Sequence, residues 1–343
     1  MSPRVGMIAP ISYAYDPLGY GPWERVTHDL TERLVADGID VTLFAPSGSE
    51  TLARLVETVP GPLSEMVDAD PRLFETEHLA VAMEAASSGA LDIVHSHLHV
   101  HALPYGSLLP IPLLTTLHGA AWNTAHHRLL LRYRKLAFVS LSDRERVFLP
   151  ELNYVATVGN GLDLARFPMG VGDGGYLAFV GRMAPEKAPD LAAAVARRAG
   201  VPLKIAGPIE NRHREFFDDF MRGADDVEYL GPLEQHEVAE LLGGAQALVM
   251  PLRWDEPFGL VVIESLAAGT PVIAWRRGAM PEIVDDGLTG FLVDDVETAA
   301  RAVTAVPSLD RAACRQAAEE RFSDARMARD YAGVYRSLTG HLR

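Results

Sequence analysis

The chain has 343 residues, 48% hydrophobic and 22% charged, which is typical of a globular protein large enough for two domains. Its formal net charge of −15 at pH 7 argues against nucleic acid as a partner, and its single cysteine, Cys314, excludes an internal disulfide. No apolar run reaches the roughly 20 residues of a membrane helix or has the form of a signal peptide, so we expect a cytoplasmic protein without stable membrane attachment.

Predicted strands and helices alternate along the first half of the chain. A strand over residues 5–9 is followed by a helix over 23–36 with regularly spaced apolar residues. A second helix is expected over residues 70–87. The other strands predicted in this half cover residues 41–45, 92–95, 113–117, 136–141 and 154–158.

A glycine-rich break at residues 170–175 separates this half from a second alternating series. Its predicted strands cover residues 176–180, 203–206, 227–230, 247–250 and 272–274, and residues 309–340 have helical spacing. Strands separated by helical segments predict parallel sheets with right-handed crossovers. The sequence therefore predicts an α/β protein of two Rossmann-like domains, residues 1–168 and 169–320, with a terminal helical segment over 321–343.

The stretch Glu256-Pro-Phe-Gly-Leu-Val-Val-Ile-Glu264 carries two carboxylates eight positions apart. It follows the predicted strand of residues 247–250, and we expect a turn and then a helix from near Phe258 to Gly269. Glu256 then stands in the turn, and Glu264 lies among apolar neighbours, where a carboxylate needs hydrogen-bonding partners. The hydroxyl groups of a polyhydroxylated ligand would supply them, whereas a lone glutamate in such a position is ordinarily a partly exposed helix residue.

This stretch matches the E-x7-E motif of retaining glycosyltransferases, and the chain resembles glycosyltransferase family 4. Further matching segments occur in the order of that family: Gly21–Arg25, Thr116–Gly119, Gly159–Asp163, Gly181–Lys187, Ala206–Pro208, Tyr229–Gly231 and Gly278–Glu282. The resemblance implies the GT-B fold, in which two Rossmann-like domains face each other across a cleft and the terminal helix of residues 321–343 packs back on the N-terminal domain. It also implies transfer of a sugar from a nucleotide-diphosphate sugar, UDP- or GDP-linked, without a metal or other cofactor.

Arg182 and Lys187 form the predicted diphosphate site. They follow the strand of residues 176–180 and lie near the start of the next helix, where guanidinium, ammonium and backbone N–H groups favour an anion. Lys187 is one of only three lysines in the chain. Both cations would stabilise the departing diphosphate more strongly in the transition state than in the ground state.

The resemblance assigns the other donor contacts. Glu264 would bind the ribose hydroxyls, Glu256 the hydroxyls of the donor sugar, and His118 would face that sugar. The remaining donor residues implied by the family are Gly21, Gly181, Leu233, Phe258, Gly259 and Leu260. The predicted catalytic residues are therefore His118, Arg182, Lys187 and Glu256.

Aromatic and histidine side chains on the N-terminal loops are the candidates for acceptor binding, because aromatic faces suit sugar rings. The residues selected are Tyr20, Trp23, His97 and Trp122. The alternating histidines of residues 95–101 look like a metal cluster, but alternate positions of an extended segment rarely converge on one ion without further ligands. We therefore expect no metal. Pro22 stands where the family usually has a second glycine, which removes a backbone donor beside the phosphate.

The acceptor and some alternative functions stay open. A small secondary metabolite is one acceptor class, and a cell-envelope glycan or lipid-linked acceptor is the other. An epimerase or phosphorylase of the GT-B fold shares the architecture, as does a sugar-nucleotide-binding protein without catalytic activity. A dinucleotide-dependent oxidoreductase fits poorly, because Gly19 comes about nine residues after the first predicted strand and Glu24 replaces the third glycine of its fingerprint.

Overall fold

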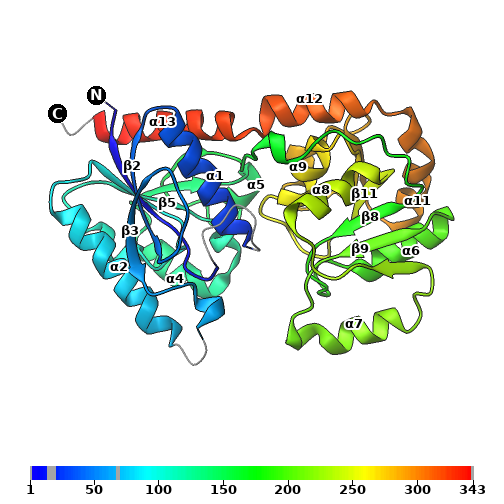
Figure 1. The fold of residues 1–343 in the computed structure, drawn as a ribbon, viewed down its shortest axis with the longest axis horizontal. Coiled ribbons are helices and arrows are strands. Elements are labelled where there is room, and N and C mark those ends of the chain that lie inside the picture. Colours follow the sequence, from blue (N-terminus) through cyan, green and yellow to red (C-terminus); the bar gives the residue numbers. More distant parts are fainter. Residues whose placement is uncertain (1, 14–20, 67–69, 341–343) are drawn as a thin grey trace. The chain divides into compact units, whose positions relative to one another are not determined.

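The computed structural model describes residues 2–13, 21–66 and 70–340, which form two compact units (Figure 1). Unit 1 comprises Met1–Gly161 and Asp324–Arg343, and unit 2 comprises Leu162–Ser323. The boundaries at 168/169 and 320/321 that we read from the sequence fall inside unit 2. Residues 162–168 belong to unit 2 because they are held there by local contacts. The Leu162 N–H donates to the Phe322 carbonyl at 2.9 Å, and the Phe167 side chain is fully buried.

Unit 1 contains a parallel sheet of seven strands in the order β3-β2-β1-β4-β5-β6-β7. The strands are β1 (Arg4–Ile8), β2 (Asp40–Pro46), β3 (Arg54–Val59), β4 (Ile93–Ser96), β5 (Leu113–Thr116), β6 (Ala137–Ser140) and β7 (Tyr154–Thr157). Its helices are α1 (Pro22–Ala36), α2 (Pro71–Ser87), α3 (Leu103–Gly106), α4 (Thr124–Arg132), α5 (Asp143–Arg146) and α13 (Asp324–Thr339), with short 3₁₀ helices η1 (Leu63–Glu65) and η2 (Ala120–Trp122).

Unit 2 contains a parallel sheet of six strands in the order β10-β9-β8-β11-β12-β13. The strands are β8 (Leu177–Val180), β9 (Leu203–Ala206), β10 (Val227–Tyr229), β11 (Ala247–Met250), β12 (Val272–Trp275) and β13 (Gly290–Val293). The helices are α6 (Pro189–Ala199), α7 (Arg214–Met221), α8 (Gln235–Gly244), α9 (Leu260–Ala267), α10 (Met280–Ile283), α11 (Val296–Ala305) and α12 (Arg311–Arg321), with 3₁₀ helices η3 (Leu164–Arg166), η4 (Asn211–His213) and η5 (Val306–Ser308).

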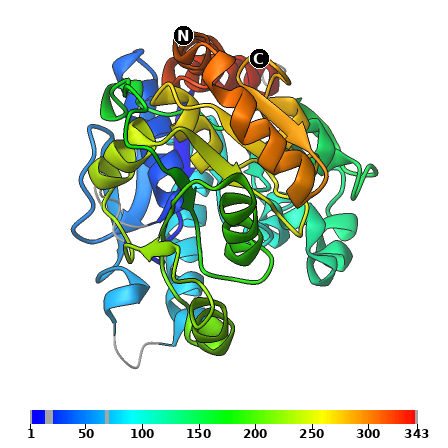
Figure 2. The same ribbon diagram turned by 90° about the vertical axis from the view of Figure 1, so that its right-hand side faces the viewer.

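Both units have the layered form expected for parallel sheets. In unit 2, α6 and α11 lie side by side (Figure 2) and close a core that includes Phe179, Val249 and Ile273. The central strands are buried because helices cover both faces, which explains why they read as short, continuous apolar runs in the sequence. The predicted α/β class with two Rossmann-like parallel sheets is confirmed.

Two edge strands, β3 and β13, are missing from the sequence-based assignment. Strand β3 has the sequence Arg-Leu-Val-Glu-Thr-Val and keeps its first four residues partly or fully exposed, so its apolar pattern is weak. Strand β13 begins at Gly290, where an added Cβ would lie 2.0 Å from the Val272 carbonyl oxygen. An edge strand has one neighbour, so pairing with that neighbour decides its existence more than its own composition does.

Helix α13 belongs to unit 1 and packs against α1. Its Tyr331 and Tyr335 are buried, with their hydroxyl oxygens 2.8 Å from Thr116 Oγ1 and His95 Nδ1, respectively. Arg326 donates to the carbonyl oxygens of Gly159 and Asn160 at 2.8 and 2.9 Å. Within the described ranges, no helix is long and apolar enough to cross a membrane.

The order of strands defines one switch point in each sheet. In unit 1, successive strands are added on one side of β1 up to β3 and then on its other side from β4 onward, so the switch point lies between β1 and β4. In unit 2 it lies between β8 and β11 for the same reason. At such a point the loops beyond the carboxyl ends of the two strands diverge and leave space for a ligand. The predicted site residues can therefore be tested against these two places.

Candidate active site

In unit 2, all the predicted donor residues except Leu233 follow the two strands of the switch point. Gly181 and Arg182 come directly after β8, and Lys187 precedes α6. Glu256, Phe258 and Gly259 follow β11 and lead into α9. Neighbouring loops approach closely here, since a Cβ on Gly207 after β9 would lie only 2.0 Å from the Gly181 carbonyl oxygen.

Lys187 and Glu256 form an ion pair across the switch point. The Lys187 ammonium donates to Glu256 Oε2, and the indole N–H of Trp254 donates to the same oxygen at 2.9 Å. The ammonium also lies 5.0 Å from the centre of the Trp254 ring, within the range of a cation–π contact. Both charged side chains are largely buried, at 15% and 13% exposure, so their attraction is only partly screened by water.

Arg182 is also held by carboxylates. Its guanidinium donates to Glu210 at 2.7 Å and to Glu186 at 3.3 Å. The Arg182 guanidinium lowers the pKa of Glu210 below its usual value, which keeps that carboxylate ionised at neutral pH. An anionic ligand at this place would have to compete with Glu210 and Glu186 for Arg182.

A second ion pair joins the same two loops. Arg253 donates to both carboxylate oxygens of Asp190, at 2.7 and 2.5 Å, and its backbone N–H donates to the Glu186 carbonyl at 3.0 Å. This pair is more exposed than Lys187–Glu256, at 39% and 33%. Arg253 thus ties the loop after β11 to the start of α6 and to the loop before it.

The Gly278-Ala279 segment packs against the backbone of Glu256. The Ala279 N–H donates to the Glu256 carbonyl at 3.0 Å, and the Gly278 N–H donates to Asp255 Oδ1 at 3.0 Å. Gly278 has φ +54, and a Cβ there would lie 2.3 Å from the Glu256 backbone nitrogen. Only glycine therefore permits this approach without a shift of the Glu256 segment.

Helix α9 begins at Leu260 after Gly259, which adopts φ +106. Phe258 is buried, and Glu264 is 3% exposed on the second turn of the helix. A carboxylate at this depth fits the motif, because it needs hydrogen-bond donors to offset burial. Leu233 lies half-buried between β10 and α8, two strands away from β8 in the sheet.

In unit 1, Gly21 and Trp23 stand at the beginning of α1, after β1, whereas Tyr20 lies outside the described residues. Gly21 has φ +148, and a Cβ there would lie 2.9 Å from Glu24 Oε2. Glu24 is 4% exposed and accepts a hydrogen bond from the Tyr13 N–H at 3.3 Å. Burial raises the pKa of Glu24, and its carboxylate binds the backbone of Tyr13, which follows β1.

His97 and His118 meet above the ends of β4 and β5. His97 Nδ1 lies 2.8 Å from His118 Nε2, and both rings are almost fully buried. Burial lowers the pKa of both imidazoles well below the usual value, so the pair is neutral and shares one proton in its hydrogen bond. The Trp23 ring lies 6.1 Å from the His118 ring, which brings three of the predicted site residues together.

Trp122 belongs to η2, and its ring packs edge-on against Phe148 at 5.0 Å. His95 is bound on both ring nitrogens, to Tyr335 and to Thr116 at 2.8 Å each. Among the described residues, no group of three or more histidine, cysteine, aspartate or glutamate side chains could hold a metal ion.

The sequence-based selection does not include two residues that shape these loops. Trp254 supplies an N–H to Glu256, and Glu145 binds the backbone next to His118. Trp254 is only two positions from Glu256, and this proximity in the sequence is the one signal that could have identified it as a site residue. Glu145 ends the pattern Ser142-Asp-Arg-Glu145, which predicts a helix start but not contact with a loop 26 positions away.

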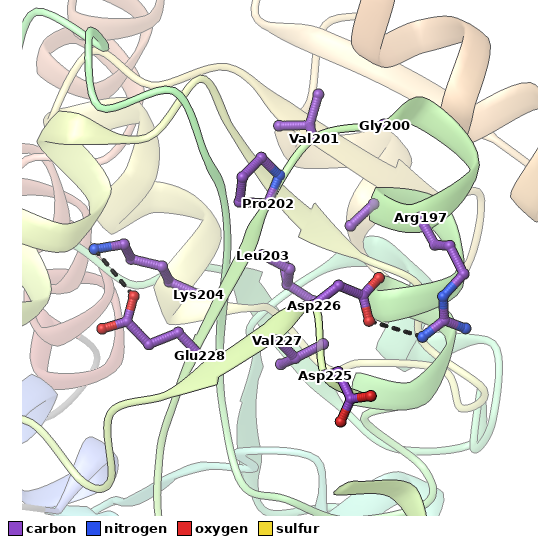
Figure 3. A pocket seen from close by; sticks show the side chains of 11 residues that line it. Arg197, Gly200, Val201, Pro202, Leu203, Lys204, Asp225, Asp226, Val227 and Glu228 are labelled. Atoms are coloured by element: carbon purple, nitrogen blue, oxygen red, sulfur yellow. Dashed lines mark hydrogen bonds and ion pairs between the residues drawn. The ribbon is translucent and has the colours of Figure 1, made fainter. Parts of the chain in front are cut away.

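A hollow of about 610 Å³ also lies on unit 2, but at the other end of the sheet (Figure 3). It is flanked by the ion pairs Arg197–Asp226 at 2.8 Å and Lys204–Glu228 at 3.3 Å. Leu203 and Val227 mark the amino ends of β9 and β10, whereas Arg182 and Glu256 follow carboxyl ends. This hollow is therefore separate from the switch point.

Comparisons with known proteins cover both units. The family model described as Glycosyltransferase Family 4 matches residues 23–166, and the model described as Glycosyl transferases group 1 matches residues 166–321. The D-inositol 3-phosphate glycosyltransferase of Frankia alni is 30% identical, over 77% of this chain and 80% of its own length. A glycogen synthase of Mycobacterium tuberculosis is 29% identical over 89% of this chain and 86% of its own.

Solved structures agree on the fold. Avilamycin A biosynthesis involves the glycosyltransferase AviGT4, whose structure matches with a TM-score of 0.75 at 24% identity, over 98% of each chain. A sucrose-phosphate synthase from Thermosynechococcus elongatus gives a TM-score of 0.80 at 20% identity, over 99% of this chain and 100% of the other. The HepE protein of Anabaena, solved with UDP and glucose, gives 0.75 at 17% identity, over 98% and 100%. With the two sheets, the family models and the related sequences in agreement, the chain belongs to the family 4-like glycosyltransferases of the GT-B fold.

Proposed function

We propose that this enzyme is a retaining glycosyltransferase that moves a sugar from a nucleotide-diphosphate sugar to a hydroxyl group of an acceptor. One observation carries the proposal, namely the Lys187–Glu256 ion pair at the switch point of unit 2. An ammonium suits a diphosphate oxygen, and a carboxylate suits sugar hydroxyls. A single ligand that contains both groups would engage the two partners at once.

The diphosphate would bind between Arg182 and Lys187. Both side chains already have carboxylate partners, so the site is close to electrically balanced before the ligand enters. A diphosphate would take over part of these hydrogen bonds, while the backbone N–H groups at the start of α9, from Phe258 to Leu260, add partial positive charge. This arrangement needs no metal or other cofactor.

The nucleoside would extend along the sheet of unit 2. Glu264, buried on α9, would accept hydrogen bonds from the ribose hydroxyls, because a carboxylate binds a vicinal diol through two oxygens. Leu233 would lie beside the base.

The chemistry that fits these groups is a front-face displacement. The bond between the anomeric carbon and the diphosphate oxygen breaks, and the bonding electrons go to the diphosphate. The acceptor oxygen then forms a bond on the same face, and its proton passes to a departing phosphate oxygen. Arg182 and Lys187 would stabilise the growing negative charge, which is the largest type of catalytic contribution that a preorganised site makes.

The acceptor would bind on the loops of unit 1. Trp23, which is 42% exposed, offers an aromatic face, and His97 offers a neutral imidazole nitrogen for a hydroxyl group, while its partner His118 would face the donor sugar. These features suit a small hydroxylated acceptor such as a secondary metabolite. A cell-envelope or lipid-linked acceptor is the alternative, and it would use the exposed cations Arg128 and Arg132 on α4.

The proposal is tested by nucleotide binding followed by transfer. Thermal shift with UDP, GDP and ADP should identify one nucleotide that raises the melting temperature, since a ligand at 100 times its dissociation constant adds about 2.7 kcal/mol. Donor sugars of that nucleotide are then screened for hydrolysis and transfer, with NMR of the anomeric proton to report retention. Inverted product would overturn the mechanism, and the absence of binding to every nucleoside diphosphate would overturn the donor class.

A further inference from the structure

The backbone at His118 adopts an unusual conformation. His118 has φ +48 and the following Gly119 has φ +90, so two consecutive residues occupy the left-handed region. For a residue with a side chain this conformation costs roughly 1–2 kcal/mol, and it persists only where the surroundings hold it. The turn between β5 and η2 therefore requires an anchor.

Glu145 supplies that anchor from α5. Its side chain is fully buried, with Oε1 accepting the Gly119 N–H at 2.7 Å and Oε2 accepting the Leu141 N–H at 2.9 Å. Ser142 caps the helix and accepts the Glu145 backbone N–H at 3.3 Å. One carboxylate thus joins the turn after β5 to the end of the adjacent strand β6.

The bond to Gly119 acts directly on His118. The Gly119 amide belongs to the peptide unit that begins at the His118 carbonyl carbon, so fixing its direction also fixes the orientation of His118. The His118 imidazole then reaches His97 Nδ1 at 2.8 Å. A shift of this turn by even a fraction of an ångström would lengthen the bond between the two rings.

A buried carboxylate is a costly way to hold a turn. Burial raises the pKa of Glu145 to about 7, which reflects the penalty of keeping its charge away from water. Burial, and to a smaller extent the charge of Glu145, raises the pKa of Tyr154 and Tyr331, and the described contacts give Glu145 no direct cationic partner. A group with this cost is explained more readily by the geometry that it sets than by the stability that it adds.

We infer that Glu145 is a positioning residue, which holds the left-handed His118-Gly119 turn so that the His97–His118 pair keeps the geometry required for sugar transfer. This inference rests on the proposed function. Glu145 does not touch substrate, and it acts through His118.

The variant Glu145→Gln tests this role at constant side-chain size. The amide oxygen still accepts one backbone N–H, but the amide nitrogen presents a donor to the other N–H. Loss of one charge-assisted hydrogen bond corresponds to roughly a 10- to 100-fold lower kcat, if the bond serves the active geometry. Affinity for the nucleoside diphosphate should change less than about twofold, because none of the proposed nucleotide contacts involves the His118-Gly119 turn.

Two controls separate positioning from general loss of stability. Tyr154→Phe removes a hydroxyl that donates to the Leu149 carbonyl at 3.2 Å near α5, and it should retain kcat. In a His118→Ala background, Glu145→Gln should have no further effect on kcat. An undiminished kcat in folded Glu145→Gln, or an independent effect in the His118→Ala background, would overturn the inference.

NMR spectroscopy tests the positioning role of Glu145 without an activity measurement. The ring-nitrogen NMR signals of His97 and His118 should show their hydrogen bond in the native protein and its weakening in Glu145→Gln. If the glutamine variant does not fold, Glu145→Asp, which keeps the charge but shortens the reach, provides the same comparison. Unchanged ring signals would refute the inference, and this holds even if no nucleotide sugar proved to be a donor. Altered ring signals in a protein without any transferase activity would refute the proposed function alone.

Discussion

Replacing Glu256 by glutamine should raise the affinity for free nucleoside diphosphate while lowering turnover. In the structure, Lys187 and Glu256 are paired, with side chains 15% and 13% exposed. A diphosphate must therefore compete with the Glu256 carboxylate for the Lys187 ammonium. Glutamine removes the charge and keeps the size, so Lys187 becomes available to the nucleotide.

The magnitude follows from the strength of that bond. A charge-assisted hydrogen bond contributes about 1.5–3 kcal/mol. Lysine has three N–H donors, so it can keep part of the contact when a phosphate arrives. If half of the energy is recovered, about 0.7–1.5 kcal/mol, the dissociation constant falls roughly 3- to 10-fold. Turnover should drop roughly 10- to 100-fold, because Glu256 would no longer bind the donor sugar with a charged oxygen.

Calorimetry with the nucleotide alone, beside steady-state kinetics, measures both quantities. Asp190→Asn is the matched control, because the Asp190–Arg253 pair joins the same two loops but is 33% and 39% exposed. Such an exposed pair contributes about 0–1 kcal/mol, so the control should leave turnover nearly unchanged. Tenfold weaker nucleotide binding in Glu256→Gln, or the same behaviour in Asp190→Asn, would refute the reasoning.

Three further predictions concern the packing of Gly278 against the Glu256 backbone, the pH dependence of stability and the independence of transfer from a metal ion. Gly278→Ala should reduce kcat/KM and lower Tm more than Gly287→Ala does, because both positions have positive φ but only a Cβ at Gly278 meets the Glu256 backbone, at 2.3 Å. Equal effects would show that backbone strain alone matters. Unit 1 should lose stability as the pH falls below about 6.5, since burial lowers the folded-state pKa of six histidines and the unfolded chain then binds protons that the folded chain does not. The six are His78, His95, His97, His99, His118 and His126. Each of the first five contributes up to about 1.4 kcal/mol per pH unit, down to the folded value of about 4 for His78, and Glu145 opposes them because its pKa is raised to about 7. A Tm that rises between pH 6.5 and 5 would contradict this. Transfer should persist in excess EDTA because side-chain cations would balance the diphosphate, and complete loss that a divalent cation restores would contradict the proposal.

The sequence by itself determined the layered α/β fold and the places where the chemistry lies. Apolar runs of four or five residues, separated by helical segments, specify buried parallel strands through local patterns alone. Gly181-Arg182 and the Glu256–Glu264 stretch follow such runs directly, so their position at the carboxyl ends of β8 and β11 follows from the chain order. Weak local patterns at the sheet edges, β3 and β13, were not sufficient.

Tertiary structure alone decided which of these groups meet. Lys187 and Glu256 are 69 positions apart, and nothing in either segment indicates an ion pair before the sheet places β8 beside β11. The contact of Glu145 with Gly119 likewise depends on the pairing of β5 with β6. Local sequence fixes backbone preference and burial, whereas the partner of a buried charge depends on strand order and register, which are set by the packing of the whole unit.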